Sequence, residues 1–233
     1  MKNPKALARV VGVLYLAVAI FGGWAQLVAR SAVHVPGDAT ATTENLVQNA
    51  GLYRAGLVSD MLMATVFVFL GLALYRLFFD ASARLATILM VFVSVSAGSI
   101  LVNLIFHFGA LLVATDPAYL AAFGTDARDG LVLLLVELHQ YGYSLGGVFF
   151  GLWLLPVGIV GYRSGMFPRW FAVIVIVGSL IWMLDPFVVF AAPEAPEFIR
   201  VAISAIPAIA EVGLILFLLI VGVLRPKSAA VAA

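Results

Sequence analysis

Residues 84–114 read RLATILMVFVSVSAGSILVNLIFHFGALLVA, an apolar run whose only ionisable side chains are Arg84 at its start and His107 near its end. A helix needs about 20 apolar residues to cross a bilayer, so this run can span one even when it is tilted. Its apolar residues are continuous rather than alternating over about ten positions, which is typical of a membrane helix and not of a barrel strand. The stretch therefore predicts a long transmembrane α-helix.

Five further stretches have the same character, and the predicted spans are residues 7–29, 53–79, 84–114, 131–161, 169–191 and 199–224. The composition agrees, because 64% of the 233 residues are hydrophobic and 11% are charged, against about half and about a quarter in a soluble domain. We expect an all-α, polytopic helix bundle of six transmembrane helices that forms a single integral membrane domain over residues 1–233, with the lipid bilayer as its surroundings.

Charge and cysteine content exclude several functional classes. The formal net charge is only +1, so no overall field attracts a nucleic acid, and no nucleic-acid partner is expected. The chain has no cysteine, which excludes a disulfide framework, a thiolate nucleophile and a zinc or iron–sulfur site built from cysteines.

The positions of the basic residues predict the orientation. One side of the predicted helices carries Lys2, Lys5, Arg9, Arg76, Arg84, Arg163, Arg169, Arg225 and Lys227, and the other carries Arg30, Arg54, Arg128 and Arg200. Because the richer side is normally cytoplasmic, we expect both termini inside and a multi-pass protein of the inner (cytoplasmic) membrane. Residues 30–52 are then an extracellular loop with a short helix capped by Thr ahead of Leu46 and Val47, and residues 115–130 form a polar turn region.

Polar side chains within the spans are costly in lipid, so each is a candidate for a site or for an assembly contact. Counted at about 1.5 Å per residue from the cytoplasmic ends, most of them fall in the outer half of the membrane. The candidate ligand-binding residues are Arg54, Asp60, Asn103, His107, Glu137, His139, Gln140, Asp185, Arg200 and Glu211.

Helical spacing suggests which candidates share a face. Asn103 and His107 are four residues apart and lie on one face of the third span. Glu137 and Gln140 lie on one polar stripe of the fourth span, and His139 lies off that stripe. Asn103 and His107 have an alternative role as hydrogen-bonding contacts between helices.

Structural roles are alternatives for the buried acids too. Asp60 is expected to pair with Arg54 or Arg200, and Asp185, which precedes a proline, to cap a helix end or to lie at the membrane interface. A carboxylate as deep as Glu211 needs a partner from another helix, a proton or a bound cation, which favours a functional role.

Several motifs point to one family. Residues 139–151 read HQYGYSLGGVFFG and residues 163–169 read RSGMFPR, with YRAG at 53–56, Ser59-Asp60 and Leu184-Asp185 elsewhere. Together they resemble the bacterial multi-pass membrane family catalogued as domain of unknown function 4386. The resemblance implies the fold and a set of patterned positions, namely Arg54, Asp60, His139, Gly142, Gly151, Gly165, Pro168 and Asp185. It implies no activity, and it does not cover His107, Glu137 or Glu211.

Three functions remain open at this point. The first is the binding or translocation of a small cation, proton or small polar ligand that enters an acidic cavity from the outer side. The second is a membrane-embedded enzyme in which His107 or His139, with acidic residues, holds a metal ion, or in which both histidines hold one haem. This hypothesis is weakened because the sequence has no HExxH motif and no close pair of histidines. The third is a structural or accessory role. The cofactor and the oligomeric state are left unassigned.

Overall fold

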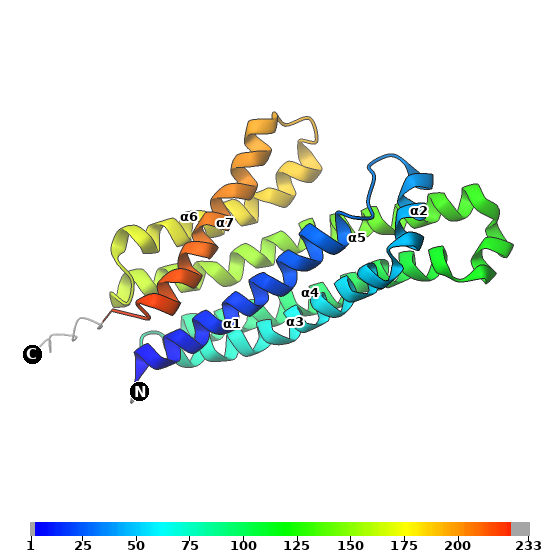
Figure 1. The fold of residues 1–233 in the computed structure, drawn as a ribbon. Helices are drawn as coiled ribbons and strands as arrows, with labels where there is room; N and C mark the ends of the chain where they lie inside the picture. The colour runs from blue at the N-terminus through cyan, green and yellow to red at the C-terminus, as the bar shows by residue number, and fades with distance from the viewer. Residues whose placement is uncertain (1–2, 225–233) are drawn as a thin grey trace, which may run out of the picture. The chain divides into compact units, whose positions relative to one another are not determined.

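The computed structural model describes residues 3–224 and is helical almost throughout that range (Figure 1). The elements are α1 (Pro4–Trp24), the π-helix η1 (Ala25–Arg30), α2 (Ala39–Gln48), α3 (Ala50–Phe78), α4 (Ala83–Thr115), α5 (Pro117–Ser164), α6 (Arg169–Ala191) and α7 (Glu197–Ile220). Counting α1 and η1 as one segment, six of these helices are long and apolar enough to cross a membrane. The all-helical class and the six expected helices are confirmed. Lys2, Arg225 and Lys227, which entered the orientation argument, lie outside the described residues.

The contacts divide the chain into two compact units. The first unit consists of Met1–Leu16, Val66–Ala97 and Ser144–Ala233, and the second of Ala17–Thr65 and Gly98–Tyr143. Helices α1, α3, α4 and α5 therefore each contribute residues to both units. The single integral domain over 1–233 stays a prediction.

The polar turn region expected at residues 115–130 is wrong, because this segment is helical. Only Asp116 separates α4 from α5, and its side chain accepts the N–H of Ala118 at 2.9 Å. Pro117 then begins α5, a position where proline costs no helical hydrogen bond. The segment is interrupted at Gly124, whose φ of 73° is open to glycine but unfavourable for other residues. Helical structure thus starts 14 residues earlier than residue 131 (131 − 117), and the break at Gly124 divides α5 into two helical pieces.

The expected loop over residues 30–52 also contains more structure than predicted. A short helix, α2, is present, but its cap is Asp38, whose carboxylate accepts the N–H of Ala41 at 2.9 Å. Thr42 is instead buried inside α2 and donates a hydrogen bond to the Val35 carbonyl at 3.1 Å. Arg30 does not belong to the loop at all, because it ends η1 as a buried residue.

Glycines allow close helix packing in the first unit, where α6 and α7 run side by side (Figure 1). Gly151 on α5 lies against α6, and the Ser179 hydroxyl donates to the Gly151 carbonyl at 2.9 Å. A Cβ at position 151 would collide with the Ser179 carbonyl and with Met183, both on α6. This contact accounts for one of the glycine positions that the sequence motif highlights.

We therefore expect Gly151→Ala to lower the free energy of unfolding by about 1–3 kcal/mol, since an added methyl forces α5 and α6 apart. Gly98→Ala is the matched control, because a Cβ there meets nothing within 4 Å. That variant should lose no stability, and the higher helix propensity of alanine should raise it by about 0.5–1 kcal/mol. Denaturation of the purified proteins in one detergent measures both, and equal stabilities would contradict the packing role of Gly151.

Candidate metal centre

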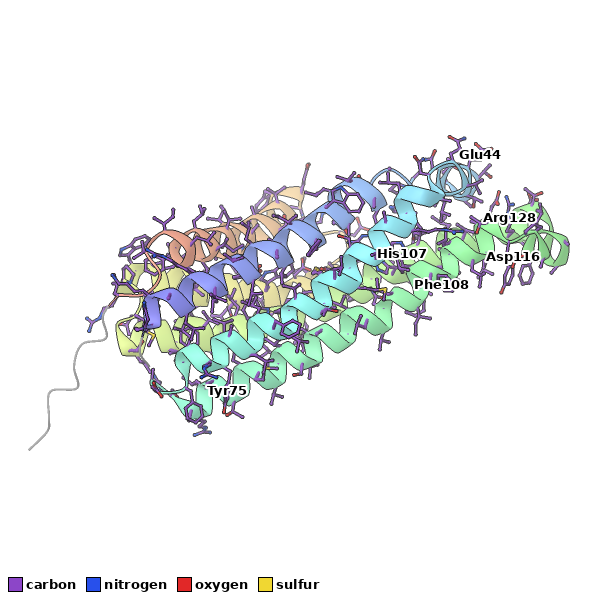
Figure 2. The ribbon with its side chains drawn as sticks, turned by 60° about the horizontal axis from the view of Figure 1, so that its bottom comes forward. Glu44, Tyr75, His107, Phe108, Asp116 and Arg128 are labelled. Carbon is purple, nitrogen blue, oxygen red and sulfur yellow. The ribbon has the colours of Figure 1, made fainter. Side chains whose placement is uncertain are left out.

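Asp60 of α3, His107 of α4 and His139 of α5 meet within the second unit. One ligand atom from each side chain lies within 4.8 Å of the other two, and the residues are 0%, 0% and 3% exposed. In Figure 2, the polar residues Glu44, Asp116 and Arg128 lie at one end of this unit, and His107 lies further from that end. Two imidazoles and a carboxylate are ligands that suit Zn²⁺ and non-haem Fe²⁺.

His107 is held in one orientation and one tautomer. Its Nε2 lies 3.0 Å from the backbone carbonyl of Tyr53, which can only accept, so Nε2 carries the proton. Its ring stacks on that of Tyr53 with the centroids 3.8 Å apart. Its Nδ1 is buried and has no hydrogen-bond partner. A metal-binding histidine typically donates its other N–H to a carbonyl in this way, which leaves the free nitrogen available to an ion.

His139 lies beside His107, although the two residues are far apart in the sequence. The ring centroids are 5.2 Å apart and the rings meet edge to face at 85°. The position of His139 is supported by Asn103, whose amide donates to the His139 carbonyl at 2.8 Å. The chain therefore does contain a close histidine pair, formed across two helices, and the residue that lies off the polar stripe of α5 is the one that joins the cluster.

The same geometry bears on the haem alternative. Two aromatic rings at 5.2 Å in an edge-to-face arrangement are in direct contact. A haem bound by both imidazoles would have to lie between these rings, where no space is left. His107 is further held by its stacking on Tyr53. The arrangement fits a small ion and does not fit a haem.

Asp60 forms a buried ion pair with Arg30, and not with Arg54 or Arg200 as expected from the sequence. Arg30 Nη1 donates to Asp60 Oδ2, and the two residues are 5% and 0% exposed. Arg54 and Arg200 are exposed. The second carboxylate oxygen, Oδ1, is buried without a hydrogen-bond partner. One side of Asp60 is thus neutralised and the other is free to bind an ion.

Arg30 is the residue that sequence reasoning missed. The Arg30 Nε donates to the Gln26 side chain at 2.8 Å, and its guanidinium lies 5.8 Å from the centre of the Tyr143 ring. Its Nη2 is buried and has no partner. The signal in the sequence is Gln26, four residues earlier at the end of an unbroken apolar run, because this spacing continues the helix through Arg30. The local π-helix is a feature common at functional sites.

The remaining candidates of the second unit lie around this cluster or apart from it. Gln140 hydrogen-bonds through its side chain to His34 Nδ1 at 2.9 Å. Glu137, one turn before Tyr141 on α5, is half-buried. A groove in this unit is lined by Gly98, Ser99, Val102, Asn103, Phe106 and Gly142. Its lining contains no acid, so the acidic outer cavity stays a prediction.

The two other acids belong to the first unit. Glu211 of α7 accepts a hydrogen bond from the indole N–H of Trp182 on α6, so its partner does come from another helix. Tyr15 of α1 also lies next to Glu211. Asp185 lies inside α6, six residues before its end at Ala191 (191 − 185), and is not a helix cap. Asp185 is half-buried at that position.

A comparison with protein families gives one match. Residues 10–222 match the family described as "Domain of unknown function (DUF4386)". The chain belongs to the DUF4386 family. No match was found among the curated proteins or among the solved structures.

The DUF4386 match extends over both units and includes all residues of the Asp60, His107 and His139 cluster. Positions that the family resemblance singled out now have visible structural roles. The Asn103 amide occupies the space where a Cβ of Gly142 would lie, and Gly165 has a φ of 73°. Pro168 directly precedes α6. His107 lies outside the resemblance motifs, and its role follows from the geometry alone.

Proposed function

We propose that this DUF4386 protein is a multi-pass membrane protein that binds one divalent transition-metal ion through Asp60, His107 and His139. The observation that carries the proposal is a pair of unpartnered atoms on two residues of the cluster: His107 Nδ1 and Asp60 Oδ1 are both buried, neither has a hydrogen-bond partner, and both are of types that bind metals. A buried acceptor without a partner costs about 1–3 kcal/mol, so the fold maintains both at a cost that a bound ion would offset. This joins the cation-binding and metal-enzyme hypotheses in one site.

The geometry is compatible with such an ion. At metal–ligand distances of about 2.0–2.2 Å, the ligand atoms of a tetrahedral site lie about 3.3–3.6 Å apart. The present limit of 4.8 Å between the ligand atoms means that the side chains need to close by at most about 1.5 Å. Each side chain comes from a different long helix, so small shifts of α3, α4 and α5 are enough.

Thermal unfolding tests the proposal. Protein purified in detergent and stripped with a chelator should gain about 2.7 kcal/mol of stability when Zn²⁺ is present at 100 times its dissociation constant. Mg²⁺, which prefers oxygen ligands, should give no comparable gain. Identical unfolding with and without Zn²⁺ up to millimolar concentration would instead assign the cluster to helix assembly.

The orientation is a separate proposal, supported by the distribution of basic residues: both termini face the cytoplasm of an inner membrane. A cysteine scan tests it in this thiol-free chain. Thr42 is buried and unsuitable for labelling, whereas Glu44 in α2 and Ala81 between α3 and α4 are exposed. A membrane-impermeant maleimide added to intact cells should label Glu44→Cys and spare Ala81→Cys. The reverse pattern would overturn the orientation.

A further inference from the structure

We infer that the metal ion is bound together with a carboxylate anion that bridges the ion and the free Nη2 of Arg30. The inference rests on the proposed metal site and adds the class of its second ligand. Two features of the site support it: the positive charge that the ion would leave uncompensated, and the Nη2 of Arg30, which has no hydrogen-bond partner.

Charge gives the first argument. Asp60 and Arg30 cancel one another, and His107 contributes a neutral imidazole, because the proton on its Nε2 leaves Nδ1 unprotonated. His139 must likewise be neutral to bind the ion. A divalent ion therefore leaves a net charge of about +2 among side chains that are at most 5% exposed. Uncompensated charge at such a place is strongly unfavourable. A bound anion removes part of it, whereas a water molecule in the same position does so only if it loses a proton to become hydroxide.

The free donor gives the second argument. Of the three nitrogens of Arg30, Nη1 contacts Asp60 and Nε contacts Gln26. Nη2 is buried with no partner, although guanidinium nitrogens are normally satisfied. It belongs to the same ion pair as Asp60, whose other oxygen is free for the metal. A hydrogen-bond donor is thus left unused on the same guanidinium that contacts Asp60.

The two arguments select a carboxylate. Three protein ligands leave at least one coordination position open, which one carboxylate oxygen can fill. The other oxygen can then accept a charge-assisted hydrogen bond from Nη2, a pairing for which the planar guanidinium is well suited. Such a carboxylate comes either from a dissolved small acid or from a fatty acid in the membrane.

Visible absorption of the Co²⁺-loaded protein in detergent tests the inference. The band that appears on Co²⁺ addition reports the metal site, and its saturable shift on titration reports the anion. We expect shifts with acetate or with decanoate and none with acetamide, the neutral analogue of acetate. Tighter binding of decanoate than of acetate would identify the membrane as the source, and the opposite order would identify the dissolved acid.

Variants of Arg30 separate metal binding from carboxylate binding. Arg30→Gln keeps a donor for Asp60 but removes the cation, so Co²⁺ should bind at least as tightly while the carboxylate binds about tenfold or more weakly. If that variant does not fold, Arg30→Lys keeps the charge but places all its donors on one compact nitrogen, which does not reproduce the planar fork of Nη1 and Nη2, so the carboxylate affinity should again fall. Arg54→Gln, at an exposed position, is the control and should behave as the wild type.

The outcomes are distinguishable. A Co²⁺ band that no carboxylate shifts, or a shift that is equal in the wild type and both Arg30 variants, would overturn the bridging anion and leave the metal site intact. Absence of any Co²⁺ band would remove the metal site and the anion with it.

Discussion

Arg30→Met is expected to destabilise the protein by about 3–5 kcal/mol, because it leaves the Asp60 carboxylate buried without its partner. Both residues are almost completely buried, with exposures of 5% and 0%, so solvent cannot replace the lost interaction. Chemical denaturation of the metal-free protein in detergent measures the effect. Arg54→Met, which truncates an exposed arginine, should change stability by no more than about 0.5 kcal/mol.

The double variant Arg30→Met with Asp60→Leu separates the ion pair from the cost of an unpaired charge. It should recover most of the loss, since apolar replacement of a buried pair is often neutral. A loss in the double variant as large as in the single variant would show that packing of the arginine stem, and not the unpaired buried charge of Asp60, dominates.

His139→Gln is expected to weaken Zn²⁺ binding by roughly 100-fold or more, because even residues outside the ligand set of metal sites contribute about 10–100-fold. Removal of this ring breaks none of the hydrogen bonds of Asp60 or His107, so the fold should be kept. His34→Gln is the matched control, since it removes a histidine of the same unit that lies against Gln140 instead of the cluster. Calorimetric titration of both variants measures the affinities, and equal losses would argue for nonspecific histidine binding.

The six helices could be predicted from sequence because continuous apolar runs determine them, and a bilayer leaves few alternatives to helices. The errors lie where local rules compete. The acidic stretch 116–129 reads as a turn, but Pro117 starts a helix there and the break is confined to Gly124. The sequence predicts Arg30 as the first residue of the loop. In the structure the π-helix η1 extends through Arg30, and the Arg30 side chain is buried.

The candidate site could be predicted only in part, for a reason of distance. Asp60, His107 and His139 are 47 and 32 residues apart (107 − 60 and 139 − 107), so no local motif joins them. The sequence identifies each as an unusual polar residue in a span but does not show which helix faces which. Helical spacing within α5 placed His139 off the polar stripe of that helix. Its place in the cluster depends on Asp60 of α3 and His107 of α4, which spacing on a single helix does not reveal.

X-ray absorption at the metal edge of the Zn²⁺-loaded protein tests the central claim most directly, since it reports the ligands of the ion itself. The proposed site predicts one ion per chain with two imidazole nitrogens and at least one carboxylate oxygen at about 2.0–2.2 Å. In His139→Gln the spectrum should show one imidazole fewer. A wild-type spectrum with only oxygen ligands, or one that His139→Gln leaves unchanged, would contradict a metal centre formed by Asp60, His107 and His139.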